Sequence, residues 1–438
     1  MPATAVILAA GMGTRMKSAL PKALHPLAGR PMLRHLLGSC EAVFDRIVVV
    51  VGPGMEAVAD AAQPHLSVVQ ADRLGTAHAA LQAAAHFGTG DVAILYADNP
   101  LIRPETLRGL LARRAAGDAA LALLVMRPPD PARYGRVIGA GEYVERIVEW
   151  ADATQSERAE TLCNAGVLCG PAQDMAQWLR AVRADNVKGE YYLTDLVALA
   201  RADGKRVAAV LAPYGELRGI NSRMELSEAE AMVQSWLRAA ALDNGVTMTD
   251  PASVFLCADT ELESDVTIGP NVVFGPCVRV ASGTEIRAFS HLEGCDIGPG
   301  CVIGPYARIR PGTGLGQGAH VGNFVELKAA QLAAGAKANH LTYLGDVEVG
   351  EATNIGAGTI TCNYDGAAKH RTIIGAHAFI GSDSSLVAPV TIGDGAFVAT
   401  GSVITEDVPA DALAIARGRQ VTKPGRAATL PHRKKGKR

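Results

Sequence analysis

Residues 374–404 read IGAHAFIGSDSSLVAPVTIGDGAFVATGSVI, and an aliphatic residue returns at every sixth position. Small residues, most often glycine, follow several of these aliphatic residues. This period is typical of a β-helix in which each hexad supplies one short strand and one corner, with the aliphatic side chain inside a prism-shaped core. We therefore predict a left-handed parallel β-helix of hexapeptide repeats.

The same period extends through most of the second half of the chain. It begins at Ile268, takes one five-residue step between Leu292 and Ile297, and continues to Leu327. We assign residues 245–421 to the β-helix. Residues 362–371 break the period with polar and aromatic residues. Because an extruded loop adds nothing to the core, we favour a functional loop over a tolerated surface insertion.

Residues 1–222 follow a different pattern, in which buried-type apolar runs alternate with helical segments. The expected strands are 5–8, 47–51 and 92–96, and the expected helices are 31–44 and 76–87. Such alternation predicts a doubly wound α/β domain with a parallel sheet, whose ligands bind at the carboxyl ends of the strands. Residues 223–244 are rich in Glu, Ala and Leu and are expected to form a connecting helix.

Composition excludes several classes of protein. The 438 residues are 48% hydrophobic and 20% charged with a net charge of −2, which argues against wholesale nucleic-acid or membrane-surface binding. The last segment, 422–438, carries seven basic residues and no acids, and we expect a disordered tail. We find no apolar run long enough for a membrane span and no signal peptide, and the eight scattered cysteines form no C-x-x-C pair. These features predict a cytoplasmic chain with reduced thiols.

A glycine loop follows the first expected strand. The sequence Leu8-Ala9-Ala10-Gly11-Met12-Gly13-Thr14-Arg15-Met16 is followed by Pro21-Lys22. Glycines let backbone N–H groups approach phosphate oxygens, and we expect the next helix N-terminus to add a favourable dipole. The loop is neither a dinucleotide fingerprint nor a Walker loop. Two cations beside one glycine loop indicate a polyphosphate ligand.

This loop resembles that of the sugar-1-phosphate nucleotidyltransferases. Over roughly residues 4–418 the chain resembles one branch of them, the bacterial bifunctional N-acetylglucosamine-1-phosphate uridyltransferase/glucosamine-1-phosphate acetyltransferases. Further matching segments, in order, are Gln70 to Thr76, Tyr96-Ala97-Asp98, Tyr134-Gly135-Arg136, Val148-Glu149, Asn164, Gly189 to Asp195 and Gly219-Ile220-Asn221.

For the first half, the resemblance implies Mg²⁺-dependent uridylyl transfer from UTP to N-acetylglucosamine-1-phosphate with release of pyrophosphate. Asp98 and Asn221 would hold the Mg²⁺, Arg15 would face pyrophosphate, and Lys22 would face the α-phosphate region. Glu149 and Asn164 would bind the sugar. The substrate-binding set that the resemblance implies is Leu8, Ala9, Ala10, Gly11, Lys22, Gln70, Gly75, Thr76, Tyr96, Ala97, Asp98, Gly135, Glu149, Asn164 and Asn221.

Three positions in this half depart from the family pattern. The family usually has Gly at position 97, an aliphatic residue or Thr at 99, and Thr or Ser at 165, where this chain has Ala97, Asn99 and Ala165. We expect the Ala97 methyl group and the Asn99 amide to lie near the nucleotide, while the metal site stays intact.

For the second half, the resemblance implies acetyl transfer from acetyl-CoA to the amine of glucosamine-1-phosphate. His340 would be the general base, the Ala357 N–H would stabilise the oxyanion, and Asn363 would orient either His340 or the amine. The remaining implied contacts are Arg310, Lys328 and Tyr343 to phosphate, Asn354 and Tyr364 to the sugar, and Ser382, Thr400 and Arg417 to acetyl-CoA. Thr400 stands where the family commonly has Ala, and Arg417 is equally well explained as part of the basic tail.

Together these motifs predict a cytoplasmic bifunctional enzyme that acetylates first and uridylylates second in UDP-N-acetylglucosamine synthesis for cell-wall precursors. The resemblance also implies a homotrimer. Two alternatives remain open from sequence: a single-activity nucleotidyltransferase with a purely structural β-helix, and a non-enzymatic scaffold with a nucleotide-sensing head. The joint presence of His340, Lys328, Arg310 and the loop 362–371 argues against the first. The two-cation glycine loop, together with Asp98 and Asn221, argues against the second.

Overall fold

The computed structural model describes residues 2–132 and 134–430. The chain forms two compact units, Met1–Gln234 and Ser235–Arg438. The division falls within helix α9 (Arg223–Asp243), which matches the expected connecting helix in position and length. Each unit is described by itself below.

The first unit is built on a nine-stranded sheet. Its strands, in spatial order, are β5 (Leu66–Val69), β4 (Arg46–Val51), β1 (Ala3–Leu8), β6 (Asp91–Tyr96), β10 (Cys163–Pro171), β7 (Leu121–Met126), β11 (Val207–Leu211), β9 (Tyr143–Val148) and β8 (Arg136–Ala140). The three predicted strands pair in parallel as expected, but the complete sheet is mixed, because β10 is antiparallel to both β6 and β7. The chain leaves β7, forms the antiparallel β8–β9 hairpin, and then returns as β10 between β6 and β7.

Helices cover both faces of this sheet, so the doubly wound architecture is confirmed. Successive residues of β1 point to opposite faces: Ala5 and Ile7 join one buried cluster, and Val6 and Leu8 join the other. The first face carries α1 (Met32–Glu41), α2 (Glu56–Ala61), α4 (Pro104–Ala115) and α8 (Tyr214–Leu217). The second face carries α3 (Thr76–Gln82), α6 (Ala172–Ala181) and α7 (Asp195–Ala202).

Smaller elements complete the first unit. These are the strand pair β2 (Pro26–Leu27) and β3 (Arg30–Pro31), the short helix α5 (Gln155–Arg158), and the 3₁₀ turns η1 (Thr14–Met16), η2 (Lys22–Leu24) and η3 (Ala84–His86). The expected helix 76–87 is therefore divided into α3 and η3. The glycine loop leads into η1 rather than an α-helix, so the expected helix dipole is absent there and the local positive charge comes from side chains.

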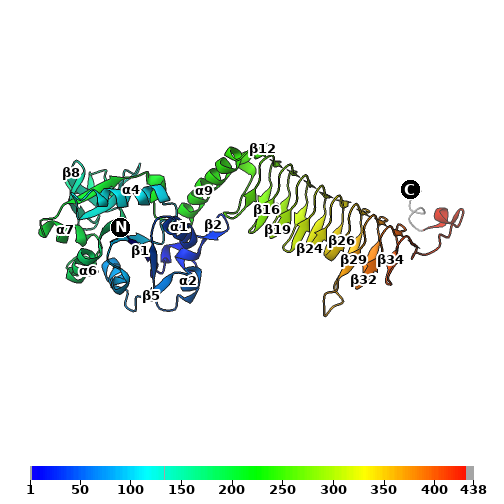
Figure 1. The fold of residues 1–438 in the computed structure, drawn as a ribbon, viewed down its shortest axis with the longest axis horizontal. Coiled ribbons are helices and arrows are strands. Elements are labelled where there is room, and N and C mark those ends of the chain that lie inside the picture. The colour runs from blue at the N-terminus through cyan, green and yellow to red at the C-terminus, as the bar shows by residue number, and fades with distance from the viewer. Residues whose placement is uncertain (1, 133, 431–438) are drawn as a thin grey trace, which may run out of the picture. The chain divides into compact units, whose positions relative to one another are not determined.

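The second unit is a parallel β-helix (Figure 1). Its 10-stranded sheet contains β12 (Thr247–Met248), β14 (Thr267–Ile268), β17 (Glu285–Ile286), β20 (Val302–Ile303), β23 (His320–Asn323), β25 (Lys337–His340), β27 (Asn354–Ile355), β30 (Phe379–Ile380), β33 (Phe397–Val398) and β35 (Leu413–Ala414). Its 14-stranded sheet contains β13 (Glu261–Leu262), β15 (Val273–Phe274), β16 (Val278–Val280), β18 (His291–Leu292), β19 (Cys295–Ile297), β21 (Arg308–Ile309), β22 (Thr313–Leu315), β24 (Glu326–Leu332), β26 (Tyr343–Val349), β28 (Ile360–Cys362), β29 (Thr372–Ile374), β31 (Ser385–Val387), β32 (Val390–Ile392) and β34 (Val403–Ile404). The 3₁₀ turns η4 (Pro251–Ser253) and η5 (Arg426–Thr429) lie near its two ends.

The six-residue period places one residue of every hexad in the prism core. All 17 positions of the predicted repeat, from Ile268 to Ile404, are at most 4% exposed. Equivalent residues in adjacent coils pair in parallel register at steps of 18 and 17 residues (268 to 286, 286 to 303). The five-residue step in the sequence therefore shortens its coil by one residue without interrupting the stack.

The segment 362–371 projects from the prism between β28 and β29 (Figure 1), as its irregular sequence predicts. Residues 364–369 are exposed, whereas Asn363 at the base of the loop is only 7% exposed. After the last strand, residues 422–430 of the predicted tail are exposed, and residues 431–438 lie outside the described residues. In the described part of the chain, we find no helix long and apolar enough to cross a membrane.

Prediction from the prism core: Ile303→Ala should lower the free energy of unfolding of the β-helix by about 2–5 kcal/mol. Ile303 is fully buried, so shortening its side chain leaves a cavity in a stack that cannot easily collapse. The matched control is Val302→Ala, because Val302 precedes Ile303 on β20 and is only half-buried. Denaturant unfolding followed by circular dichroism measures both variants, and equal losses of stability would contradict the assignment of the core.

Candidate active sites

A cavity of about 410 Å³ opens where β1 and β6 end. Both strands are parallel, so their carboxyl ends meet at one edge of the sheet, where doubly wound folds bind ligands. The structure brings together 13 of the residues singled out from sequence: Leu8, Ala9, Ala10, Gly11, Arg15, Lys22, Gln70, Gly75, Thr76, Tyr96, Ala97, Asp98 and Asn221.

The glycine loop owes its shape to a close approach by Lys22. Gly13 has φ +64°, and a Cβ on it would lie 2.5 Å from Lys22 Cβ. Only glycine fits that combination of backbone conformation and crowding. The loop start is fixed to the sheet by a 2.8 Å hydrogen bond from Ala9 N to Val50 O. Lys22 is therefore directed into the cavity by the backbone packed against it.

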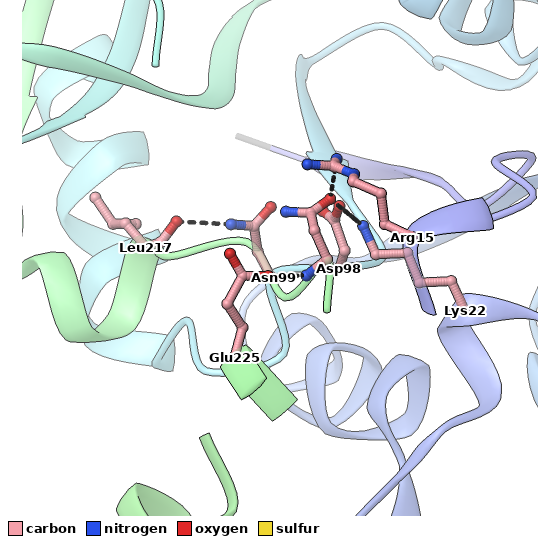
Figure 2. A network of polar contacts seen from close by, with 7 residues as sticks. Arg15, Lys22, Asp98, Asn99, Leu217 and Glu225 are labelled. Atoms are coloured by element: carbon pink, nitrogen blue, oxygen red, sulfur yellow. Dashed lines mark hydrogen bonds and ion pairs between the residues drawn. The ribbon is translucent and has the colours of Figure 1, made fainter. Parts of the chain in front are cut away.

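Two cations and two oxygen-bearing side chains converge in the cavity (Figure 2). The Lys22 ammonium forms an ion pair with Asp98 and donates to Asn221 Oδ1 at 2.6 Å. The Arg15 guanidinium donates to the same Asn221 oxygen at 2.7 Å. Asp98 lies in the turn that follows β6, whereas Asn221 comes from the segment before α9, so only the tertiary fold joins them.

This arrangement fits a small hard cation. The Asp98 carboxylate and the Asn221 carboxamide oxygen already share one positive group, the Lys22 ammonium. Oxygen ligands are those that Mg²⁺ takes, with water and substrate phosphates completing its octahedron. No group of three or more His, Cys, Asp or Glu suited to a metal occurs within residues 2–132 and 134–430. These two side chains could therefore supply two oxygen ligands to such a cation.

The segment 70–76 forms one wall of the cavity. Gln70 Nε2 donates to Gly75 O at 3.1 Å, which closes a compact turn. Gly75 has φ +127°, and a Cβ there would lie 2.5 Å from Tyr191 O. The Thr76 hydroxyl accepts a 2.9 Å hydrogen bond from Leu193 N. The two family-like segments 70–76 and 189–195 are therefore packed directly against each other.

Gly135, Glu149 and Asn164 form a neighbouring group outside the 410 Å³ cavity. Asn164 N donates to Gly135 O at 2.9 Å, and a Cβ on Gly135 would lie 3.5 Å from both Glu149 carboxylate oxygens. Burial raises the pKa of Glu149, although the Thr194 hydroxyl donates to it at 3.3 Å. The half-buried Glu149 carboxylate lies beside Gly135, which has no side chain to cover it. Its oxygens are hydrogen-bond acceptors of the kind that bind sugar hydroxyls.

Tyr96 connects this group to the cavity. Its ring packs so closely on Gly166 that a Cβ there would lie 2.3 Å from Tyr96 Cε2. Burial raises the pKa of the Tyr96 hydroxyl, with smaller contributions from Glu149 and Asp98. The phenol therefore stays protonated and can donate a hydrogen bond.

The three departures from the family pattern have different surroundings. Ala97 lines the cavity, and its N–H donates to Leu8 O at 3.0 Å. Ala165 is 7% exposed within a buried cluster. Asn99 does not lie beside the nucleotide cavity as expected: it is 3% exposed and its amide donates to Leu217 O at 2.7 Å (Figure 2). A buried amide is satisfied by a nearby carbonyl, so it turns away from the cavity.

In the β-helix, His340 lies at the end of β25 and is exposed. Asn323 occupies the equivalent position one coil earlier, and its Oδ1 lies 2.7 Å from His340 Nδ1. An amide oxygen can only accept, so Nδ1 carries a proton, and in the neutral ring Nε2 therefore keeps its lone pair. The ring is thus held in the tautomer that can act as a base through Nε2.

The residues expected to hold phosphate lie on adjacent coils of the 14-stranded sheet. Arg310 donates to Glu326 Oε1 at 2.7 Å, and Lys328 is aligned with Gly345 on the next coil. Lys369 of the projecting loop lies against Lys328, which lowers the pKa of Lys369. Two ammonium groups in contact repel each other unless an anion lies between them, so this position suits a phosphate.

Tyr343 and Asn363 meet above a glycine. A Cβ on Gly345 would lie 2.4 Å from the Tyr343 hydroxyl and 2.8 Å from Asn363 Nδ2. Asn363 also donates to the Asp346 carboxylate. Asp346 therefore fixes the amide at the base of the projecting loop.

A column of residues continues from His340 along the later coils. Gly358 N donates to His340 O at 3.4 Å, and Asp383 N donates to Ala357 O at 2.8 Å. Gly401 N then donates to Ser382 O at 2.8 Å, and Arg417 donates to Thr400 O at 2.8 Å. The expected acetyl-CoA contacts Ser382, Thr400 and Arg417 thus follow one another on successive coils.

The two expected sugar contacts are placed differently. Asn354 is half-buried at the start of β27, aligned with Phe379 on the next coil. Tyr364 is 60% exposed on the projecting loop, where its hydroxyl donates to Gly366 O at 2.6 Å. The structure therefore keeps the Tyr364 hydroxyl within its own loop.

Several residues of these sites escaped the sequence reasoning. Thr14, Arg73 and Glu190 also line the first cavity without a predicted role, beside Gly13 of the predicted glycine loop, and Arg73 Nε donates to Ala10 O at 2.9 Å. In the β-helix the missed partners are Asn323, Glu326, Asp346 and Lys369. Asn323 could have been found, because it precedes His340 by 17 residues, the length of one short coil.

Comparisons with known proteins agree with this division of the chain. Residues 5–159 match the family described as MobA-like NTP transferase domain, and residues 371–406 match bacterial transferase hexapeptide (six repeats). The protein from Granulibacter bethesdensis named bifunctional protein GlmU is 67% identical over 437 residues, 99% of this chain and 97% of the relative. Its namesake from Gluconacetobacter diazotrophicus is 66% identical over 433 residues, 98% of this chain and 94% of the relative.

The fold and the two sites define a nucleotidyltransferase unit joined to a hexapeptide-repeat transferase unit. The chain belongs to the family of bifunctional GlmU proteins. The predicted family is thereby confirmed. So is the predicted bifunctional enzyme of UDP-N-acetylglucosamine synthesis, with acetyltransferase and uridylyltransferase activities.

Prediction from the carboxylate cluster: Asp195→Asn should stabilise the protein more at pH 7.5 than at pH 4. Burial, with Glu149 and Asp152 nearby, raises the pKa of Asp195 to about 6. The folded state therefore holds a proton that the unfolded state has lost, and Asp195 costs stability increasingly as pH rises from about 4 to about 6. Melting temperatures of both proteins at the two pH values test this. A difference in melting temperature independent of pH would contradict it.

Proposed function

We propose that the first cavity performs uridylyl transfer through the residues gathered there. A phosphate oxygen of N-acetylglucosamine-1-phosphate attacks the α-phosphorus of UTP, and the bond to the bridging oxygen breaks to release pyrophosphate. Arg15 binds the leaving pyrophosphate, and Lys22 turns from Asp98 to the α-phosphate region. Because both substrates are anionic, positioning and charge neutralisation account for most of the catalysis.

The proposed metal is Mg²⁺, held by Asp98 and Asn221. When bound, it would supply charge neutralisation on the phosphates of UTP. This proposal is supported by the contact of both oxygens, Asp98 Oδ2 and Asn221 Oδ1, with the same positive group, the Lys22 ammonium. Gln70, Gly75 and Thr76, with the loop Leu8 to Gly11, bind the nucleotide. Gly135, Glu149 and Asn164 bind the sugar.

The proposed acetyl transfer occurs at the corner of the β-helix that carries His340. The amine nitrogen of glucosamine-1-phosphate attacks the thioester carbonyl carbon, His340 Nε2 takes the amine proton, and the C–S bond breaks to release CoA. The Ala357 N–H stabilises the oxyanion. The tautomer imposed by Asn323 supports this role for Nε2.

At this corner, one group of residues binds glucosamine-1-phosphate and a second group binds acetyl-CoA. Arg310, Lys328 and Tyr343 hold the sugar phosphate, Asn354 and Tyr364 contact the sugar, and Asn363 orients His340 or the amine. Acetyl-CoA lies along the column of Ser382, Thr400 and Arg417. The contact between Lys328 and Lys369 supports a phosphate at this position.

We propose uridyltransferase, connecting-helix and acetyltransferase segments at 1–222, 223–244 and 245–421, and a disordered basic tail at 422–438. We also propose a cytoplasmic homotrimer that acts on small molecules and binds neither nucleic acid nor membrane. Hexapeptide repeats support the oligomer, because β-helix acyltransferases of this family share their active sites between prisms.

The observation that carries the proposal is the separation of the two sites on two compact units, each with its own chemistry. A paired assay on the purified chain tests it. One reaction contains glucosamine-1-phosphate and acetyl-CoA and reports free thiol. The other contains N-acetylglucosamine-1-phosphate, UTP and Mg²⁺ and reports pyrophosphate. Signal in both is expected, and thiol without pyrophosphate would contradict the assignment of the first cavity.

Prediction for the two sites: His340→Ala should reduce acetylation by about 10²–10⁴-fold and leave uridylylation unchanged. Asp98→Ala should do the reverse, because it removes the carboxylate proposed to hold the metal. The two assays above measure both variants, and each untouched activity reports that the chain has folded. Loss of both activities from either change, in a folded protein, would exclude two independent sites.

Prediction for the general base: Asn323→Ala should lower kcat for acetylation about tenfold or more, because Nδ1 loses the acceptor that fixes the tautomer. Asn323→Asp keeps an acceptor oxygen beside Nδ1 and should therefore retain more of the acetylation rate than Asn323→Ala. An unchanged kcat in Asn323→Ala would show that Asn323 does not position His340.

A further inference from the structure

The segment that carries Asn221 is separated from Asp98 by more than 100 residues and has to be held beside it. Leu217 ends helix α8, and residues 218–221 then pass Asp98 without regular secondary structure. Gly219 lies beside Asp98, and a Cβ on it would be in ordinary van der Waals contact with Asp98 Cγ at 3.8 Å. The position of the Asn221 oxygen therefore depends on a few hydrogen bonds.

Two hydrogen bonds join this segment to the end of β6. Ile220 N donates to Asp98 O at 2.8 Å. Asn99 Nδ2 donates to Leu217 O at 2.7 Å, across 118 residues of sequence. A third bond, from Asn221 N to Glu225 Oε2 at 2.6 Å, anchors the segment to the start of α9. Of these contacts, only that of Asn99 joins the two segments through a side chain.

The Asn99 amide is turned away from the catalytic groups (Figure 2). Its side chain is 3% exposed, and it does not line the nucleotide cavity. A direct contact with the nucleotide is therefore excluded by its direction and burial. Because removing the donor would leave a buried carbonyl unsatisfied, the bond to Leu217 has a strong influence on where that segment lies.

We infer that Asn99 is a positioning residue of the uridyltransferase site, which fixes Asn221 beside Asp98 by binding the Leu217 carbonyl. This inference rests on the proposed roles of Asp98 and Asn221. It explains why a polar residue is stable at a buried position next to the metal-binding carboxylate. It also predicts that Asn99 acts on metal dependence more than on nucleotide contacts.

The test uses the full-length protein with Asn99→Leu, which has a side chain of similar size but no donor, and Asn99→Ala as a second variant. Hydrogen exchange of the Ile220 amide, measured without ligands, should become about tenfold faster. The Mg²⁺ concentration that gives half the maximal uridylylation rate should rise about tenfold, with acetylation unchanged.

The matched control is Thr106→Val. It removes the 2.6 Å hydrogen bond from Thr106 Oγ1 to Glu216 Oε2, which also anchors α8 but leaves the Leu217 carbonyl and Asp98 untouched. This control should shift neither readout. Equal shifts in the control and the Asn99 variants, or no shift in the Asn99 variants, would overturn the inference. Retained uridylylation in Asp98→Ala would instead overturn the proposed metal site itself.

Discussion

The burial of one aliphatic side chain per hexad is the interaction on which the acetyltransferase half depends. Each coil leaves a strand edge that the next coil must pair, and the buried positions hold the coils in register. Because the register is fixed, residues one coil apart are always neighbours. Asn323 and His340 are brought together in this way, as are Lys328 and Gly345.

In the nucleotidyltransferase unit the candidate site residues are not brought together by a repeat. They come from segments that are far apart in the sequence and meet at one edge of the sheet. The parallel strands β1 and β6 deliver the glycine loop and Asp98 to the same edge. Asn221 arrives from a segment without regular structure and is tied there by Ile220 and Asn99. The site proposed to bind the phosphates of UTP has its two cations in Arg15 and Lys22, and no α-helix N-terminus follows the glycine loop.

Features that depend on residues close together in the sequence were predicted correctly, whereas features that depend on distant residues were not. Hexad positions were predicted correctly because the period is local and repeated. The reversed strand β10 was missed, since strand direction depends on the hairpin β8–β9 that precedes it and on pairing with β6 and β7. Asn99 was placed wrongly, because proximity in sequence to Asp98 does not reveal which way a side chain turns.

By itself the sequence determined the two architectures, the helix at 223–243 and the projecting loop, and it supplied the candidate residues of both sites. It could do so because periodicity and glycine-rich turns act over a few residues. The tertiary structure alone decided the partners: Lys22 with Asp98 and Asn221, Asn323 with His340, and Asn99 with the Leu217 carbonyl. These pairs depend on strand order, coil length and burial, which bring together atoms that no local pattern connects.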